Sequence, residues 1–464
     1  MANTYDVIVI GSGPGGYVAA IRAAQLGMKT AVVERENLGG ICLNWGCIPT
    51  KALLKSAEVM DYLHHAEDYG LKASKVSHDF GKVIERSRGA ADKMSKGVDF
   101  LLRKNKVDVL EGHGKLSPDK RVVVTDKAGT SISHEAKHII LATGARSRNL
   151  PHMQIDGKKI IGYREAMTLP KQPKKMIVVG SGAIGMEFAY FYHNMGTEVV
   201  VIEFMDKILP REDADVSKLM ARIYKKKGMT IMTSSEVTEV DSSGRGVVAT
   251  VKTKKGEEKI QGDILLSAVG ISPNTENLGL GSLNIKTDRG LVQVDEFYQT
   301  NVPNIYAIGD IIPGPALAHM ASHEAILCVE KIAGLDVHPI DYGNIPSCTY
   351  CQPEVASVGI TEAEAKDKGM EIKVGKFPFS ASGKATASGK NDGFVKVIFD
   401  AKYGEFLGAH MVGAGVTDMI AEVVVARKLE TTGHEIIKAV HPHPTMSEAV
   451  MEAAAAAYGE VVHL

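Results

Sequence analysis

Short apolar runs that lead into glycine-rich turns recur along this chain. Residues 5–10 are mostly apolar and β-branched, as in buried parallel strands, and the turn GSGPGG (11–16) follows directly. Residues 17–26 then place apolar side chains at helical spacing, and a second apolar run, 30–33, ends at Glu34. The pattern predicts a strand, a helix and a second strand parallel to the first.

The same arrangement returns near the middle of the chain. Residues 175–179 predict a strand, GSGAIG (180–185) predicts the turn and the start of a helix, and 198–202 predict a strand that ends at Glu203. Glu34 and Glu203 each lie 23 positions after the first glycine of their turn. One such turn is a weak signal, because glycines often mark only a bend, but two complete copies predict two dinucleotide sites.

The residue types in both copies suit a pyrophosphate and a ribose. The first glycine permits the bend, the second lets a pyrophosphate approach the backbone, and the third allows the helix to pack closely. These glycines are Gly11, Gly13 and Gly16 in the first copy and Gly180, Gly182 and Gly185 in the second. Glu34 can accept hydrogen bonds from a ribose diol. Glu203 favours NAD over NADP because it would repel a 2′-phosphate, unless it is only a solvated residue at a strand end.

Further strands predict an α/β fold with a different C-terminal part. Residues 114–142 alternate as β segments and lead into Ala142-Thr143-Gly144, and the apolar run 304–308 leads into Gly309-Asp310. A carboxylate after a buried strand can bind a polyol hydroxyl, although Gly-Asp is also an ordinary turn. From about residue 345 strands precede helices, which predicts an α+β domain of roughly 120 residues. Its predicted strands are 394–399 and 406–411, and its predicted helices are 416–428 and 445–458.

Composition narrows the classes of partner. The 464 residues contain 54 Lys and Arg against 55 Asp and Glu, so no global positive field attracts nucleic acid or an anionic membrane. No apolar run approaches the roughly 18 to 20 residues that cross a bilayer, and no basic segment precedes the first apolar run. Five cysteines are too few for a secreted disulfide framework. We therefore expect a cytoplasmic protein.

Two of the cysteines lie directly after the first βαβ pattern. Cys42 and Cys47 stand in GGICLNWGCIPTK (39–51), and Pro49 marks the first turn of a predicted helix, whose dipole would favour a thiolate. The four-residue spacer does not fit the usual CxxC zinc pairs, so we predict no metal site. The pair could be two buried structural thiols, but its place beside a dinucleotide turn favours a redox-active disulfide.

A histidine segment, HPHPTMSE (441–448), precedes the last predicted helix. Disulfide exchange needs a base that takes a thiol proton near neutral pH, and His443 is a candidate for that base. Glu448 could orient its imidazole and raise its basicity. Histidines in loops are usually only solvated, so this assignment from the residues alone stays open.

Taken together, these motifs resemble the FAD-dependent pyridine nucleotide-disulfide oxidoreductases from end to end. The segment CIPTKALL (47–54) is similar to the branch that acts on lipoamide, whereas glutathione reductases typically carry a different continuation. The resemblance implies two Rossmann-like dinucleotide-binding domains, for FAD and NAD, and a C-terminal dimerisation domain. The expected bounds are 1–145 with 271–340 for the FAD domain, 146–270 for the NAD domain and 341–464 for the dimerisation domain.

The resemblance also implies roles for individual residues. FAD would contact Gly11, Gly13, Gly16, Glu34, Lys51, Gly114, Thr143, Gly144, Asp310, Ala316, Leu317, Ala318 and His319. NAD would contact Gly180, Gly182, Gly185, Glu187, Glu203, Val237 and Gly270. Cys42 would exchange with the substrate dithiol while Cys47 faces the flavin, and Lys51 would pair with Glu187. His443, supported by Glu448, would be the base, supplied by the second subunit of a homodimer.

The activity implied is oxidation of dihydrolipoamide on the lipoyl-bearing carrier domains of 2-oxoacid dehydrogenase or glycine cleavage complexes, with hydride passed to NAD. Two alternatives are a related enzyme that uses another disulfide, such as glutathione disulfide, and a flavoprotein kept only as a structural subunit. Trp45 stands between the cysteines where the family often has a small aliphatic residue, and it could shield the disulfide or fill the core. Cys348 and Cys351 form a CxxC that the family does not require; we expect unpaired thiols there rather than a second redox pair.

Overall fold

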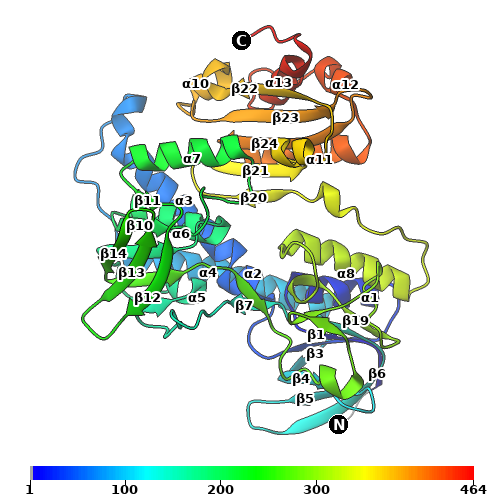
Figure 1. Cartoon of the computed structure of the whole chain (residues 1–464). Helices are drawn as coiled ribbons and strands as arrows, with labels where there is room; N and C mark the ends of the chain where they lie inside the picture. The colour runs from blue at the N-terminus through cyan, green and yellow to red at the C-terminus, as the bar shows by residue number, and fades with distance from the viewer. Residues whose placement is uncertain (1–3) are drawn as a thin grey trace. The chain divides into compact units, whose positions relative to one another are not determined.

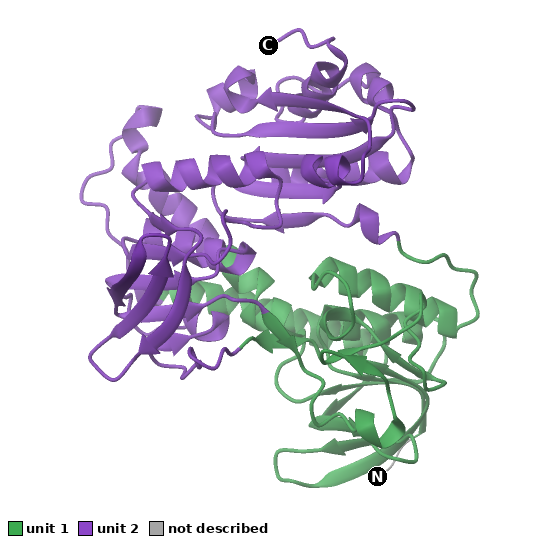
Figure 2. Cartoon of the chain, viewed as in Figure 1, with its two compact units in different colours: residues 1–52, 82–148, 271–340 green, residues 53–81, 149–270, 341–464 purple. Residues whose placement is uncertain are grey.

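The chain forms two compact units, each assembled from three separate segments (Figure 2). Unit 1 comprises residues 1–52, 82–148 and 271–340, and unit 2 comprises residues 53–81, 149–270 and 341–464. The structure is a computed structural model that describes residues 4–464.

Unit 1 is built around a parallel sheet with strand order β3-β2-β1-β6-β19, and β5 and β4 continue from the first part of β6 as an antiparallel pair (Figure 1). The bounds are β1 (Thr4–Ile10), β2 (Thr30–Glu34), β3 (Asp108–Glu111), β4 (His113–Leu116), β5 (Val122–Thr125), β6 (Ser131–Leu141) and β19 (Ile305–Ala307). Ile10 and Ala307 both pair with Leu141, at the carboxyl ends of their strands. The first glycine-rich turn, the segment after Leu141 and the segment after Ala307 therefore leave the sheet at one edge.

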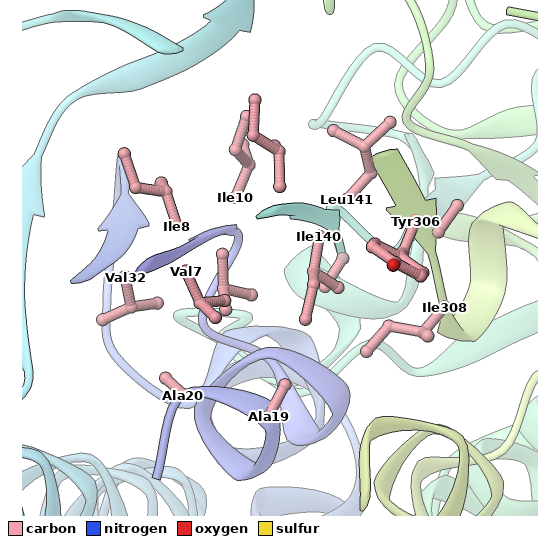
Figure 3. Packing of buried hydrophobic residues seen from close by; sticks show 14 of the residues in the cluster. Val7, Ile8, Ile10, Ala19, Ala20, Val32, Ile140, Leu141, Tyr306 and Ile308 are labelled. Atoms are coloured by element: carbon pink, nitrogen blue, oxygen red, sulfur yellow. The ribbon is translucent and has the colours of Figure 1, made fainter. Parts of the chain in front are cut away.

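Helices cover this sheet and bury its apolar side chains. The helices are α1 (Pro14–Gln25), α2 (Gly40–Trp45), α4 (Phe80–Lys104) and α8 (Ala318–Ile332), while α3 (Cys47–His64) begins in unit 1 and has its residues from Leu53 onward in unit 2. In Figure 3, Ala19 and Ala20 of α1 lie on the side of the sheet toward which Val7 points, while Ile8 and Ile10 extend to the opposite side. These small side chains are fully buried, so the helix axis can come close to the strands.

Short two-stranded ladders complete unit 1. They pair β7 (Ala145–Ser147) with β16 (Ile271–Pro273) and β17 (Thr287–Asp288) with β18 (Leu291–Val292). The first of these ladders stands where the chain leaves unit 1 and where it returns, so it joins two segments that are distant in sequence.

The first part of unit 2 repeats the same architecture. A five-stranded parallel sheet has the order β11-β10-β9-β15-β8, and an antiparallel sheet has the order β12-β13-β14. The strands are β8 (Ile160–Ile161), β9 (Lys175–Val179), β10 (Glu198–Ile202), β11 (Thr230–Met232), β12 (Glu236–Asp241), β13 (Val247–Thr253), β14 (Gly256–Gly262) and β15 (Ile264–Ser267). The helices are α5 (Tyr163–Ala166), α6 (Ala183–Asn194) and α7 (Ala214–Lys226).

The C-terminal part of unit 2 has an antiparallel sheet with the order β20-β21-β24-β23-β22. Its strands are β20 (Ser347–Thr349), β21 (Glu354–Gly359), β22 (Ile372–Pro378), β23 (Phe394–Asp400) and β24 (Phe406–Gly413). Its helices are α9 (Glu362–Asp367), α10 (Gly383–Ala387), α11 (Val416–Lys428), α12 (Gly433–Lys438) and α13 (Glu448–Tyr458). Helices α11 and α13 contribute buried residues to the same apolar core as β23 and β24.

The structure confirms the two βαβ units and the α+β C-terminal part, and it shifts some boundaries. Helix α1 begins at Pro14 rather than at residue 17, and α3 begins at Cys47, so that Pro49 is its third residue. Proline is tolerated there because the first amides of a helix have no partner within the helix. The last helix starts at Glu448 rather than at residue 445, because residues 443–447 form bends and a turn instead of a helical turn.

Candidate active site

The first glycine-rich turn has the shape that a pyrophosphate requires. Gly11 has a φ of +104°, and a Cβ there would lie 2.3 Å from the carbonyl oxygen of Ala142. A Cβ on Gly16 would lie 1.9 Å from the carbonyl oxygen of Gly11, so both positions exclude larger residues. A Cβ on Gly13 would meet nothing within 4 Å, so open space lies beside the N-terminus of α1. A phosphate placed there would face the positive end of a 12-residue helix.

The second turn repeats these contacts. A Cβ on Gly180 would lie 2.4 Å from the carbonyl oxygen of Ala268, and one on Gly185 would lie 2.0 Å from that of Gly180. The middle glycine, Gly182, again faces open space at the N-terminus of α6, which also has 12 residues. Each unit therefore contains one glycine-rich turn with open space at the N-terminus of the following helix. We call each of these turns, together with that helix N-terminus, a cradle.

A serine holds the acidic residue in each cradle, and the sequence interpretation overlooked it. Ser181 donates to Oε2 of Glu203 from its backbone nitrogen at 2.8 Å and from its hydroxyl at 2.6 Å, while the backbone nitrogen of Met205 donates to Oε1 at 2.8 Å. Ser12 makes the same pair of bonds to Oε2 of Glu34, at 3.1 and 2.5 Å. The signal was present in the sequence, because both turns read Gly-Ser-Gly.

Glu203 keeps room for a further donor. A carboxylate offers about four acceptor positions, and on Oε1 the structure gives one donor, the nitrogen of Met205. Glu203 is only 6% exposed, so its charge is held in a setting where hydrogen bonds to it are strong. A ribose hydroxyl can therefore bind at Oε1 while Ser181 fixes the opposite oxygen.

Other expected first-site residues come from the edge where β1, β6 and β19 end. The Thr143 hydroxyl donates to the carbonyl oxygen of Asn274 at 2.7 Å, which ties this loop to the third segment of unit 1. Burial raises the pKa of the Asp310 carboxyl because it disfavours the charged form. A hydrogen bond from a polyol hydroxyl would stabilise that charged form. Gly114 lies on β4, where a Cβ would press on Ile10 and Val33 at 3.0 and 3.1 Å.

The remaining first-site residues lie on α3, at the start of α8 and in the loop after β6. Lys51 lies in the second turn of α3, and the 316–319 segment leads into and begins α8, with Ala318 as the first helical residue. Gly144 follows Thr143 with a φ of +65°.

The expected second-site residues other than the glycines lie on α6, on β12 and after β15. Glu187 is 5% exposed on α6, and its Oε1 accepts a hydrogen bond of 3.0 Å from the backbone nitrogen of Tyr350. Val237 is buried on β12, and Gly270 follows β15 with a φ of +111°. The expected pairing of Lys51 with Glu187 stays a prediction.

Cys42 and Cys47 form a disulfide between two consecutive helices. Cys42 lies in α2, Cys47 is the first residue of α3, and their Cα atoms are 4.7 Å apart. Cys47 therefore sits at the N-terminus of an 18-residue helix, whose dipole stabilises a thiolate when the bond opens.

His443 and Glu448 form a hydrogen-bonded pair on the surface of unit 2. Nδ1 of His443 lies 2.8 Å from Oε1 of Glu448, and the backbone nitrogen of Thr445 donates to Oε2 at 2.7 Å. Burial would raise the pKa of Glu448, but these two hydrogen bonds and the nearby charges of His443 and His441 together outweigh it and lower the pKa. The His443 side chain is 78% exposed, so its second nitrogen is accessible from solvent. The peptide bond between His443 and Pro444 is cis.

A second histidine in this segment, His441, is held more firmly than His443. Its Nδ1 lies 3.0 Å from the carbonyl oxygen of Ala439 and its Nε2 lies 2.7 Å from Oε1 of Glu422. Both partners are acceptors, so the ring satisfies both only as the imidazolium. The hydrogen bond to Glu422 accordingly raises the pKa of His441. Sequence patterns do not reveal this pair, because His441 lies in the loop after α12 whereas Glu422 lies on α11.

The CxxC in the C-terminal part is not a disulfide. Neither Cys348 nor Cys351 is disulfide-bonded, and burial raises the pKa of the Cys351 thiol to about 12, which keeps it protonated. This agrees with the expectation that these two cysteines do not form a second redox pair. Within residues 4–464, no group of three or more potential ligands is arranged to hold a metal ion.

Family models match both parts of the chain. A model described as pyridine nucleotide-disulphide oxidoreductase matches residues 5–325, and one described as the dimerisation domain of the same enzymes matches residues 345–454. The chain belongs to the pyridine nucleotide-disulphide oxidoreductase family. It is therefore an oxidoreductase that uses FAD and NAD, and its two cradles and one disulfide fit that family.

Relatives of this oxidoreductase match over the full length. Proteins named dihydrolipoyl dehydrogenase from Rhizobium etli and from Zymomonas mobilis are each 52% identical to it, with all of both chains covered. The crystal structure of LpdA from Mycobacterium tuberculosis superposes with a TM-score of 0.90 at 28% identity, over 98% of this chain and 99% of that one. No helix among the described residues of this oxidoreductase is long and apolar enough to cross a membrane.

Proposed function

We propose that this oxidoreductase is a dihydrolipoyl dehydrogenase that oxidises protein-bound dihydrolipoamide and reduces NAD. The observation that carries the proposal is the Cys42–Cys47 disulfide at the start of α3, in the unit that also holds the first cradle. The name that the full-length relatives share supports the choice of lipoamide over other disulfides.

The cradle of unit 1 is assigned to FAD. Its pyrophosphate would lie at the open space beside Gly13, its ribose would bind Glu34, and half-buried Asp310 would accept a hydrogen bond from a hydroxyl of the ribityl chain. The other contacts assigned to it are Gly11, Gly16, Lys51, Gly114, Thr143, Gly144, Ala316, Leu317, Ala318 and His319. On this assignment, residues 1–145 and 271–340 form the FAD domain.

The cradle after β9 is assigned to NAD. Its pyrophosphate would lie beside Gly182, and the buried carboxylate of Glu203 would accept a hydrogen bond from a hydroxyl of the adenosine ribose. A 2′-phosphate would bring negative charge against this anion, so NADP is disfavoured. The other contacts assigned to it are Gly180, Gly185, Glu187, Val237 and Gly270. Residues 146–270 would be the NAD domain and residues 341–464 the dimerisation domain of a homodimer.

The protein side chains carry out the thiol chemistry. His443 takes a proton from dihydrolipoamide, and the resulting thiolate attacks Sγ of Cys42, which breaks the disulfide and forms a mixed disulfide. The second substrate thiol then attacks the substrate sulfur of that bond, releases lipoamide and leaves both cysteines reduced. Bound FAD would supply the two-electron relay between the reduced Cys42–Cys47 pair and NAD. Glu448 holds the His443 ring by its Nδ1, so the other nitrogen is the one that exchanges the proton.

The substrate dithiol would arrive on the lipoyl arm of a carrier domain in a multienzyme complex, and we place the enzyme in the cytoplasm. NADH-dependent reduction of lipoamide, compared with glutathione disulfide and with NADPH as donor, tests the assignment. We expect lipoamide with NADH to be preferred by at least an order of magnitude over either alternative; preference for glutathione disulfide would replace lipoamide as the substrate.

The Cys47→Ser variant tests the thiol chemistry separately. It removes the disulfide, so lipoamide turnover should be abolished, while NADH-to-dye electron transfer, which needs only the dinucleotides, should remain measurable. Lipoamide turnover retained in this variant would refute the role of the disulfide.

A further inference from the structure

The helix that carries Cys42 is too short to keep its position unaided. Helix α2 has six residues, begins after Gly39 in the left-handed conformation, and ends at Trp45, before Gly46 with φ of −149° and ψ of −112°. Isolated helices shorter than about 12 residues are marginal in water. In the oxidised enzyme the disulfide ties α2 to α3, and that tie is lost whenever the cysteines are reduced.

Helix α4 contacts the segment at two points. The guanidinium of Arg88 donates to the carbonyl oxygen of Asn44 at 2.7 Å, and its Cζ lies 4.3 Å from the centre of the Trp45 ring. The hydroxyl of Ser95 donates to the carbonyl oxygen of Leu38, just before α2, at 2.8 Å. Arg88 and Ser95 are seven positions apart, so they lie on one face of α4, two turns from each other.

The Asn44 side chain joins these two points. Asn44 is 3% exposed, and its Nδ2 donates to the carbonyl oxygens of Leu38 and Gly40, each at 2.9 Å. The beginning and the end of α2 are thus connected through one buried amide, and α4 donates to both ends. None of these bonds involves a sulfur atom, so all of them can persist when the disulfide opens.

We propose that Arg88 is a positioning residue that holds α2 in the dithiol state, so that Cys42 stays opposite Cys47 between the reductive and oxidative half-reactions. The inference rests on the proposed redox role of the disulfide. In that cycle dihydrolipoamide loses two electrons and two protons and becomes lipoamide, while the disulfide gains them and becomes two thiols. A held dithiol closes again quickly because its sulfurs remain at high effective concentration.

Trp45 helps to hold Arg88 in place. Its ring is the flat surface on which the Arg88 guanidinium rests, a contact that a small aliphatic residue between the cysteines could not offer. Both the charge-assisted hydrogen bond and the stacking therefore bear on the last two residues of α2. Only arginine can make both contacts, because lysine can donate a charge-assisted hydrogen bond but has no planar face to stack on the Trp45 ring.

Hydrogen exchange of the amides of residues 40–46 tests the proposal directly. The holoenzyme is examined oxidised and after reduction with a phosphine, which prepares the dithiol whether or not dihydrolipoamide is a substrate. In the natural protein we expect protection to change less than about threefold on reduction. In Arg88→Ala we expect protection close to that of the natural protein while oxidised, and a further loss of about tenfold or more once reduced, as a lost charge-assisted hydrogen bond implies.

Two further variants sharpen the result. Arg88→Lys keeps the charge but not the planar face, so its loss on reduction should be intermediate, and it carries the test alone if Arg88→Ala does not fold. Arg103→Ala, on the same helix in an exposed pair with Asp99, should exchange like the natural protein in both states. Lipoamide turnover should fall in the order natural protein, Arg88→Lys, Arg88→Ala, because slower reclosure lowers kcat.

Three outcomes would overturn the proposal: equal losses of protection in both redox states of Arg88→Ala, no loss in either state, or loss of protection in the natural protein on reduction. The proposed function would be refuted by a different result, in which the phosphine reduces the disulfide but neither dihydrolipoamide nor NADH does. The holding role of Arg88 would then be judged by the exchange data alone.

Discussion

Replacing Ser181 with alanine removes the shortest contact to the buried acid of the second cradle. The Ser181 hydroxyl donates to Oε2 of Glu203 at 2.6 Å, and two backbone donors remain, from Ser181 and Met205 at 2.8 Å each. A hydrogen bond to a charged group contributes about 1.5–3 kcal/mol, and the remaining donors recover part of that. We therefore take about 1–2 kcal/mol as the loss in NAD binding, which raises KM for NAD by roughly 5- to 30-fold.

Steady-state assays with NAD as the varied substrate measure this effect, and kcat should change much less because no reacting atom is touched. The matched control is Ser12→Ala, which makes the same chemical change in the first cradle, where Ser12 bonds Glu34. It should weaken FAD retention, measured by flavin release on dilution, and leave KM for NAD within twofold. An unchanged KM in Ser181→Ala, or an equal rise in Ser12→Ala, would refute the reasoning.

The remaining predictions concern the base and two ion pairs of unit 2. In His443→Gln, dihydrolipoamide oxidation should fall by about 10²-fold or more, since general-base catalysis typically contributes that factor, and an unchanged rate would exclude His443 as the base. In Lys396→Met, the 3% exposed ammonium that contacts Asp213 at 3.0 Å is lost and leaves a buried carboxylate uncompensated; the free energy of unfolding in urea should fall by about 3–5 kcal/mol, against under about 1 kcal/mol for Lys376→Met at the surface. Glu422 raises the pKa of His441, so the folded state gains stability from this pair fully below the ordinary histidine pKa and loses it as pH rises through the raised value. Glu422→Gln should therefore lower the urea midpoint more at pH 5.5 than at pH 8.5, and an equal difference at both pH values would contradict the shift.

The sequence alone determined the elements whose signals are local. The predicted strands 175–179 and 198–202 and the predicted helix 416–428 coincide with β9, β10 and α11, because apolar periodicity and flanking glycines act within a few residues. The Gly-x-Gly-x-x-Gly spacing likewise determined where open space lies beside each helix N-terminus, since the first and third glycines are set by backbone contacts inside the same unit. The proximity of Cys42 and Cys47 follows equally from five positions of sequence separation.

The tertiary structure alone decided which distant side chains meet. Arg88 reaches Asn44 across 44 positions, and Lys396 reaches Asp213 across 183, contacts that no periodicity encodes. Ser181 and Glu203 were both visible in the sequence, yet their hydrogen bond depends on two parallel strands ending at the same edge of a sheet. The physical reason is that propensity and patterning act over neighbouring residues, whereas partners for buried charges and polar groups are chosen by how the finished elements pack.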